Sequence, residues 1–388
     1  MRFLLLGVIA ALSLGVAAEA RQAAAVSPAE LASAIDKLGS FDLAVRTGAS
    51  RTVRRAAADL ASPALTKAAL AHADGYVRYR ALVLLAGFGD ASVAATMRQV
   101  MTDPNDRLRT VAYGWFEHHH DSTVVPALLA ALPREQSEFV RPALLRSLVA
   151  YGDDAPARAA ILPLVMRGED DFRGVVIEAL GNYRAAYAIA PITEVAKLDG
   201  PLQDDAVTAL GKIGDPGVKT TLAELQRSAP KDAQPAIAAA LCLLDSNCPS
   251  NEDYLRKSVA FAASADGYQP LLRGASHGLA EIAARGNRGA LGALLDAGVP
   301  SKDPARAPIA LAVGMVAVRN PSIVLDVLEG RRDRDGVIEL LRDAFDMLAS
   351  EDYELERFYV DVRRAYWAAP AGSPRRQLAE TLITKLEF

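Results

Sequence analysis

The chain has 388 residues, 51% of them hydrophobic, and its 43 basic and 47 acidic residues give a net charge of −4. This mildly acidic balance gives no overall electrostatic reason to hold nucleic acid or an anionic membrane surface. Beyond the N-terminal region, no stretch offers the roughly 18 uninterrupted apolar residues of a transmembrane helix, so we expect no membrane span in the mature chain.

The N-terminus has the pattern of a secretory signal peptide. A charged start precedes an apolar stretch from Phe3 to Ala18, and small residues at Ala18 and Ala20 form an A-x-A site. This order predicts a signal peptide over 1–20, cleavage after Ala20 and export to the periplasm or beyond. A retained N-terminal anchor is the alternative. We expect residues 21–40 to form a mobile tail.

A block of 14 residues then recurs along the chain. The blocks start 31, 32, 32 and 30 residues apart, at Val77, Leu108, Val140, Phe172 and Leu202. A fixed period in this range is typical of a stacked solenoid, in which each unit buries its apolar face against its neighbours. Weaker copies extend the pattern on both sides, so the sequence predicts a repeat array over 41–248.

Each block has the periodicity of a helix. Apolar residues at offsets 4, 8 and 11 from the first residue fall in one narrow stripe, which predicts a buried helical face. Gly89, Gly152 and Gly214 occupy offset 12, where a left-handed glycine would close the helix. A second apolar helix follows each block, and no segment alternates as a strand does. The predicted fold class is therefore all-α, an α-α superhelix of stacked helical hairpins.

The block pattern V/L/F-R-x-x-A…L-x-x-x-G-D, followed by a P-A-L-L-type helix, resembles HEAT repeats in the short bacterial form shared with phycobilin-lyase-type HEAT-like proteins. The resemblance covers about residues 70–245. It implies a curved solenoid whose second helices form the concave surface, and a structural ladder of opposite charges that pair between neighbouring units. The ladder comprises Arg78, Arg109, Arg141 and Arg173, and Asp90, Asp121, Asp153 and Asp215.

Partner binding is expected on the exposed side of the block helices, at offsets 2, 6 and 9. Tyrosine and arginine are common interface anchors, and small residues at these offsets would let a partner's backbone approach. The candidate partner-binding residues are Tyr79, Val83, Glu117, Arg146 and Glu178. The hypothesis is an exported scaffold that binds a protein or peptide along its concave face, without catalysis or a cofactor. A plain solvated face and a purely structural envelope component are the alternatives.

His118, His119 and His120 favour a different function. Three adjacent imidazoles in an exported protein suggest zinc or copper, so the alternative is a metal-dependent or ligand-modifying, lyase-like enzyme centred there. The repeat alignment favours a structural role, because His119 takes a position that is aromatic in other blocks. One enzyme class of the HEAT family binds iron through His-Glu dipeptides, and this sequence contains none. We therefore predict no catalytic, cofactor-binding or metal-binding residues.

After the array, the repeat pattern becomes irregular. Cys242 and Cys248 are separated by a short polar turn, and export would place them where disulfides persist, so a local bridge is predicted and two free thiols are the alternative. Residues 249–388 are expected to be divergent helical repeats with a C-terminal cap. Aromatic residues are densest near the C-terminus, where core packing is expected and a docking surface is the alternative: Tyr353, Phe358, Tyr359, Tyr366 and Trp367.

Overall fold

The computed structural model describes residues 26–89, 91–245, 248–348 and 352–386. These ranges contain 22 α-helices, five short 3-10 helices and no strand, which confirms the all-α prediction. The expected signal peptide, 1–20, lies outside the described residues. Among those described, no single helix has the length and apolar character to span a bilayer. Only α18 (Arg306–Arg319) and α19 (Pro321–Glu329) taken together do, and they are bent by 112° at their junction.

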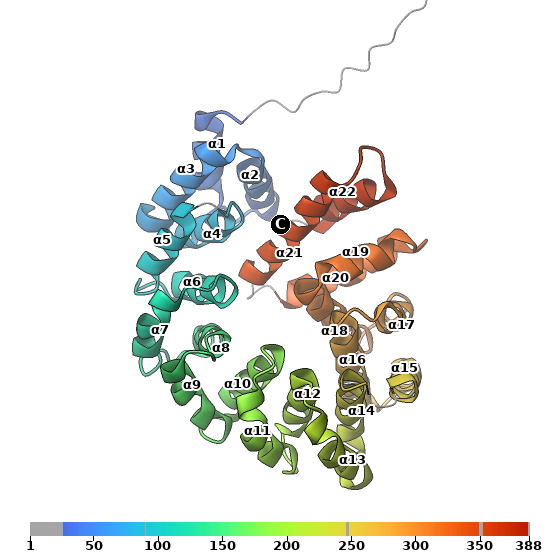
Figure 1. The fold of residues 1–388 in the computed structure, drawn as a ribbon. Helices are drawn as coiled ribbons and strands as arrows, with labels where there is room; N and C mark the ends of the chain where they lie inside the picture. The colour runs from blue at the N-terminus through green and yellow to red at the C-terminus, as the bar shows by residue number, and fades with distance from the viewer. Residues whose placement is uncertain (1–25, 90, 246–247, 349–351, 387–388) are drawn as a thin grey trace, which may run out of the picture.

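The helices form two concentric layers around a ring (Figure 1). The inner layer consists of α4 (Gly75–Ala86), α6 (Asp106–His118), α8 (Arg141–Ala150), α10 (Asp170–Asn182), α12 (Gln203–Ile213), α14 (Gln234–Leu243), α16 (Gln269–Ala284), α18 (Arg306–Arg319) and α20 (Arg334–Met347). The outer layer consists of α3 (Ala58–Ala71), α5 (Ala91–Val100), α7 (Val125–Ala131), α9 (Ala155–Ile161), α11 (Ile189–Ala196), α13 (Lys219–Ser228), α15 (Cys248–Ser264), α17 (Arg288–Gly298) and α19 (Pro321–Glu329).

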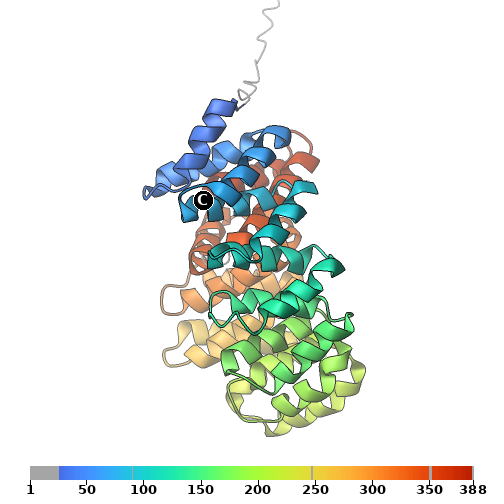
Figure 2. The same cartoon turned by 90° about the vertical axis from the view of Figure 1, so that its left-hand side faces the viewer.

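The remaining helices bring the two ends of the chain together. They are α1 (Pro28–Lys37), α2 (Leu43–Arg55), α21 (Asp352–Ala368) and α22 (Pro374–Leu386). The 3-10 helices lie in the connections: η1 (Ser122–Val124), η2 (Leu162–Val165), η3 (Ala186–Ala188), η4 (Pro216–Val218) and η5 (Lys231–Ala233). Helix α21 packs against α4 and α6, so the superhelix closes on itself, and Figure 2 shows the first and last helices at the same end of the molecule.

The block helices line the inside of the ring, and the second helix of each unit lies outside. This is the reverse of the arrangement that the resemblance implied, in which the second helices would form the concave surface. Glycines on the inner helices explain how the tight curvature is reached. A Cβ added at Gly181 would lie 2.8 Å from Ala209 Cα, and one at Gly211 would lie 2.4 Å from Ala240 Cα. These small residues let neighbouring inner helices approach one another, and not a partner's backbone.

The predicted buried stripe is confirmed at its two central positions. Every residue at offsets 4 and 8 is fully buried: Ala81, Ala112, Leu144, Val176 and Ala206, and Leu85, Phe116, Leu148, Leu180 and Leu210. Gly89 and Gly214 adopt the left-handed conformation, with φ of 67° and 83°, and Gly214 ends α12 as predicted. Gly152 has no positive φ, and a Cβ there would meet the Tyr187 hydroxyl at 2.4 Å, so its role is close packing.

The ladder arginines bind main-chain carbonyls at the end of the preceding outer element or in the turn that follows it, and not the ladder aspartates. The bonds are Arg78 Nε to Ala69 O (2.9 Å), Arg141 Nη1 to Leu132 O (3.0 Å), Arg173 Nε to Val165 O (3.1 Å) and Arg109 Nη1 to Asp103 O (2.8 Å). Carbonyls at a helix end lack intrahelical partners, so these guanidinium groups satisfy them while joining consecutive helices. The ladder is structural, but the predicted pairing of its two series is wrong for the described residues.

The ladder aspartates cap the next helix in two units. Asp121 Oδ1 accepts from Thr123 N at 3.0 Å, and Asp215 Oδ1 accepts from Gly217 N at 2.7 Å. Asp153 does not cap α9, because the following residue does so instead. Asp90 lies outside the described residues. Where a ladder aspartate has an ion pair, as Asp121 does, its partner is Arg98 of the preceding outer helix.

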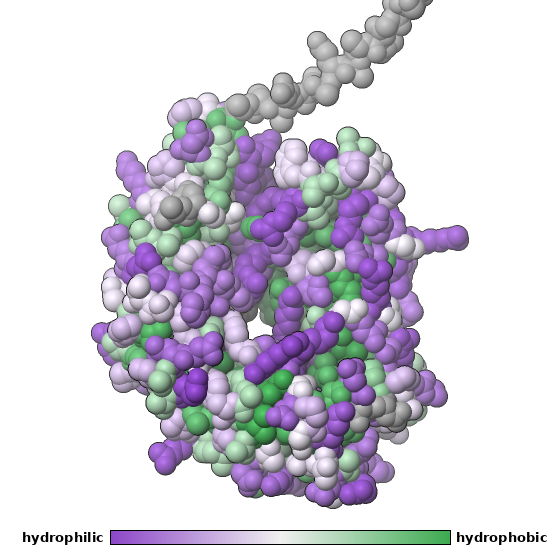
Figure 3. All heavy atoms as spheres, viewed as in Figure 1, coloured by the Kyte–Doolittle hydropathy of each residue, from purple (hydrophilic) through white to green (hydrophobic). Residues whose placement is uncertain are grey.

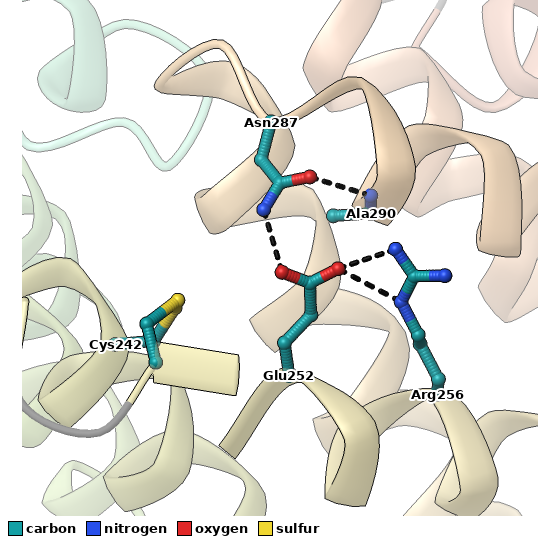
Figure 4. The surroundings of a disulfide bond; sticks show 6 residues. Cys242, Glu252, Arg256, Asn287 and Ala290 are labelled. Atoms are coloured by element: carbon teal, nitrogen blue, oxygen red, sulfur yellow. Dashed lines mark hydrogen bonds and ion pairs between the residues drawn. A yellow bond between two sulfur atoms is a disulfide. The ribbon is translucent and has the colours of Figure 1, made fainter. Parts of the chain in front are cut away.

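Two further predictions concern the flanks of the array. The tail expected over 21–40 contains α1, which begins with a capping box at Ser27 and Glu30 and buries Leu31 and Ile35. Cys242 and Cys248 form a disulfide between α14 and the start of α15, beside the Glu252 ion pair with Arg256 shown in Figure 4.

Candidate functional site

The two ends of the chain meet through a polar contact, which we call the closure interface. It joins Arg54, Tyr79, Arg80 and His118 of the N-terminal helices to Asp352, Glu354 and Glu356 of α21. Arg54 pairs with Glu356, and the other bonds are Tyr79 Oη to Asp352 Oδ2 (2.7 Å), Arg80 Nη1 to Asp352 Oδ2 (2.7 Å) and His118 Nε2 to Glu354 Oε1 (3.0 Å). These contacts link residues more than 230 positions apart in sequence, with separations of 302, 273, 272 and 236.

Small residues allow this close contact. A Cβ at Gly114 of α6 would lie 3.0 Å from Tyr353 Cδ1, and one at Gly87 would lie 2.8 Å from Glu356 Oε1. The ring of Tyr353 is buried with the N-terminal core, whereas Phe358 is buried with the C-terminal core. Helix α21 therefore packs against both the N-terminal and the C-terminal core, and the contact that closes the ring is made by polar and aromatic side chains.

Two of the predicted partner-binding residues are buried in the closed ring. Tyr79 is only 7% exposed and its hydroxyl donates to Asp352, and Val83 is 1% exposed. Burial and the neighbouring Asp352 carboxylate raise the pKa of Tyr79 far above its usual range. The expectation that both residues face solvent is wrong, because the chain's own C-terminal helix covers that part of the inner face.

A pocket of about 730 Å³ opens beside the closure interface. Its walls come from α2, α4, α6, the turn before α8 and the start of α8, the end of α20 and the start of α21. Its volume is within the range of small-ligand and peptide-anchor pockets. Figure 3 shows this side of the ring hollowed at its centre, with hydrophilic residues around the hollow. Of the five predicted partner-binding residues, Tyr79 and Arg146 line this pocket.

The mouth of the pocket is aromatic and charged. The guanidinium carbon of Arg107 lies 5.6 Å from the ring centroid of Tyr76 and 5.5 Å from that of Tyr79, and no carboxylate among the described residues pairs with it. Phe139, in the turn before α8, is 70% exposed. A stacked guanidinium beside an exposed aromatic ring is the composition of a protein-binding hot spot.

The other predicted residues form ion pairs away from the pocket or at its edge. Glu117 Oε2 lies 3.3 Å from Arg146 Nε, and its other oxygen accepts from the hydroxyl of Tyr183 at 3.2 Å. Burial raises the pKa of Glu117, and Arg146 partly offsets this. Glu178 pairs with Arg319, on the opposite side of the ring.

That opposite side contains a central charge cluster, formed by Glu178, Lys212, His277, Glu281 and Arg319. Lys212 Nζ and Arg319 Nη1 lie 3.1 Å and 2.6 Å from Glu281 Oε1. Burial opposes ionisation of Glu281, but Arg319 and Lys212 outweigh it and lower its pKa to about 2. The cluster joins α10 and α12 to α16 and α18, so it is a structural brace across the ring.

The three adjacent histidines point in different directions. His118 bonds to Glu354, His119 stacks on Trp115 with ring centroids 4.1 Å apart, and His120 stacks on Tyr151 at 4.4 Å. Burial is the main cause of the lowered pKa of His119. The three imidazoles therefore do not converge on one metal.

One of the histidines has a possible set of metal ligands nearby. Ligand atoms of Glu117, His118 and Glu354 lie within 4.8 Å of one another. Arg357 competes for the same atoms, because its Nη1 lies 2.9 Å from His118 Nε2 and 2.5 Å from Glu354 Oε2. A divalent cation here would need Arg357 to move away.

Sequence reasoning missed several residues that form the site. Phe139 had a usable signal, since it is an isolated aromatic residue in a polar turn between two apolar helices. Asp352, Glu354 and Glu356 had only a local excess of acidic residues, which does not reveal that their partners lie near the N-terminus. Arg107 lies one residue before the block start, outside the offsets considered.

Comparisons with known proteins found one family model and several solved structures that are similar to this chain. No curated protein matches the chain. One similar solved chain belongs to a structure of Kap95p binding to RanGDP; it has 13% identity and a TM-score of 0.42, and the match covers 93% of this chain and 60% of that one. Another belongs to the CpcE–CpcF complex of phycocyanin lyase from Nostoc sp. PCC7120, with 17% identity, a TM-score of 0.27 and coverage of 84% and 97%. This chain thus spans 60% of the length of the first. Residues 62–149 match the family model of HEAT repeats, so this part of the array is similar to HEAT repeats.

Proposed function

We propose that this chain is an exported HEAT-repeat scaffold that holds a segment of another protein in the pocket beside the closure interface, without covalent chemistry. The observation that carries the proposal is the pocket mouth. There an exposed Phe139 and a tyrosine-stacked Arg107, which pairs with no carboxylate among the described residues, line a cavity of about 730 Å³. Covering a large exposed ring with a partner is favourable, and a guanidinium group stacked on tyrosine rings is a common anchor in protein interfaces.

The walls of the pocket favour a peptide segment over a large flat surface. The pocket is bounded on one side by α4 and α6 and on the other by α21, so an occupant must enter between the two ends of the ring. The pattern of residues 1–20 supports export, which would place the encounter in the cell envelope or outside the cell.

Site-specific photocrosslinking tests the proposal. p-Benzoylphenylalanine is introduced at position 139 in the full chain, in its own cells, and crosslinked species are identified by mass spectrometry. Position 261 is the matched control, because Phe261 is also an exposed phenylalanine, 49% accessible, but lies on α15 of the outer layer. We expect a discrete partner at position 139 that is lost when Arg107→Ala is added.

The outcomes separate clearly. An identical crosslinking pattern at the two positions, or a partner at 139 that is indifferent to Arg107→Ala, would move the binding site away from this pocket. Edman sequencing of the purified protein tests export at the same time. An N-terminus at Arg21 is expected, whereas an intact Met1 in the cytosolic fraction would refute it.

A second candidate function is a metal-dependent one at Glu117, His118 and Glu354. The 4.8 Å spread of their ligand atoms favours it, and the contacts of Arg357 with His118 and Glu354 disfavour it. Elemental analysis of untagged protein tests whether this metal site exists. A stoichiometric metal that is lost in His118→Ala would establish the metal site, and a metal content independent of His118 would remove it.

A further inference from the structure

The candidate metal ligands lie where the two ends of the chain meet. Glu117 and His118 are the last two residues of α6, and Glu354 lies in the first turn of α21, which packs against α6 (Figure 1). Their side chains are 9%, 23% and 19% accessible, so an ion can reach them from solvent. An ion bound by all three would join two helices that are far apart in the sequence.

The imidazole of His118 lies between two groups that it cannot satisfy together. Its Nε2 is 3.0 Å from Glu354 Oε1 and 2.9 Å from Arg357 Nη1. With a proton, Nε2 donates to the carboxylate and faces the N–H of Arg357. Without one, it accepts from Arg357 and faces a carboxylate oxygen. A cation without hydrogens satisfies both groups, because it takes a lone pair from the nitrogen and another from the oxygen.

The third ligand, Glu117, is held in place by a second layer of contacts. Its Oε2 lies 3.3 Å from Arg146 Nε, and its Oε1 accepts from the hydroxyl of Tyr183 at 3.2 Å. Such contacts orient a metal ligand and leave lone pairs for the ion. The ligands of a tetrahedral zinc ion are about 3.4 Å apart, so the spread of 4.8 Å closes with side-chain shifts of about an ångström.

The cation that now occupies this position is easily displaced. The Nη1 atom of Arg357 contacts both His118 and Glu354, where a metal ion would bind. The side chain of Arg357 is 35% accessible, compared with 7% for Arg54 and 11% for Arg80. Exposed ion pairs contribute little to stability, so Arg357 can turn into solvent at little cost.

We infer that a zinc ion replaces Arg357 Nη1 between Glu117, His118 and Glu354 and holds the ring closed. This inference rests on the second candidate function, and it assigns the ion a structural role. An imidazole nitrogen favours zinc over magnesium or calcium, and the two carboxylates balance its two charges. Since His118 and Glu354 are 236 residues apart, zinc binding is coupled to the contact between α6 and α21.

Isothermal titration of the untagged full chain with zinc chloride tests the competition with Arg357. Arg357→Gln removes the competing charge and keeps all three ligands, so zinc should bind at least about tenfold more tightly. Arg364→Gln is the matched control, because Arg364 lies on the same helix but pairs with Asp361, and its side chain is 73% accessible. A zinc affinity that does not rise in Arg357→Gln, or that rises equally in the control, would overturn the inference.

Hydrogen exchange of the unchanged chain tests the coupling to closure. Zinc at about 100 times its dissociation constant should slow exchange in α21 by up to about 100-fold, because the open ring lacks the complete ligand set. Exchange in α10 and α12 should change little, and magnesium should have no effect. His118→Ala should abolish the slowing. His72→Ala should keep it, since His72 also lies beside a carboxylate, 3.3 Å from Asp36 Oδ1, but that partner belongs to α1.

Failure of the bridge can be told apart from failure of the metal site. If zinc binding depends on His118 but leaves exchange in α21 unchanged, the metal site stands and its role in closure is refuted. If no zinc binds, or if binding is indifferent to His118→Ala, both are refuted. The peptide pocket is independent of these results, because the crosslinking at position 139 tests it separately.

Discussion

Replacement of Glu356 by glutamine should open the ring. Both carboxylate oxygens bind arginine: one pairs with Arg54, and the other accepts from Arg363 Nη2 at 2.7 Å. The side chain of Glu356 is 3% exposed and that of Arg54 is 7% exposed. Burial opposes ionisation of Glu356, but the two guanidinium groups outweigh it, so its pKa is lowered.

The magnitude follows from the geometry. Removal of one partner from a buried ion pair costs about 3–5 kcal/mol, because the remaining charge keeps its desolvation penalty. Glutamine keeps one acceptor oxygen, and Arg363, with 22% of its side chain exposed, can turn toward solvent. These two effects favour the lower end of the range, about 3 kcal/mol. Since α21 joins the ends of a repeat array, the loss should appear as local opening of the closure interface before global unfolding.

Hydrogen exchange measures that opening. A loss of about 3 kcal/mol corresponds to roughly 100-fold faster exchange of amides in α21. Exchange in α10 and α12, which the central charge cluster holds, should change little. Glu194→Gln is the control, because its pair with Lys197 is exposed, with side-chain accessibilities of 64% and 51%, and should contribute less than about 1 kcal/mol. Unchanged exchange in α21, or equal acceleration throughout the ring, would refute the view that buried charge pairs hold it closed.

Three further changes test other parts of the structure. Burial, reinforced by neighbouring carboxylates, raises the pKa values of Asp204 and Asp205 to about 6. Because the pKa of a buried aspartate is higher in the folded state than in the unfolded state, the folded state loses stability as pH rises from 4 to 6. Asp205→Asn removes this loss, so it should stabilise the protein by about 1–2 kcal/mol at pH 8 and have little effect at pH 4. A pH-independent difference in urea denaturation would contradict this. Gly211→Ala should destabilise by about 1–3 kcal/mol, because its Cβ would lie 2.4 Å from Ala240 Cα, whereas Gly292→Ala in α17, with nothing within 4 Å, should stabilise by about 0.5–1 kcal/mol. Equal thermal shifts for the two glycine variants would show that inner-helix packing is not the constraint. Arg78→Met should lower the free energy of unfolding by about 1–3 kcal/mol, because the Ala69 carbonyl and the Asp103 carboxylate both lose this donor. An unchanged free energy of unfolding in denaturant would count against carbonyl capping by the ladder.

Local sequence was sufficient for the repeating unit. The period, the helical hairpin and the buried offsets 4 and 8 follow from contacts within a unit and with its immediate neighbours. The same local scale explains why the Cys242–Cys248 disulfide lies within the reach of one turn. The charged ladder was recognised as structural for this reason too, although its arginines proved to bind carbonyl groups and carboxylates outside the ladder. A helix-end carbonyl leaves no mark in the side-chain sequence, so the identity of those partners could not be read from it.

Tertiary structure alone decided the parts that matter for binding. Each unit adds a small rotation to the last, and only the accumulated rotation shows whether an array stays open or brings α21 back onto α4. No local pattern encodes that Tyr79 meets Asp352 across 273 residues, or that the block helices face inward. The pocket arises only from that closure, because its two walls belong to opposite ends of the chain. The amino-acid sequence by itself thus determined the repeat and its stacking, and the three-dimensional path of the array decided which residues remain free to recognise a partner.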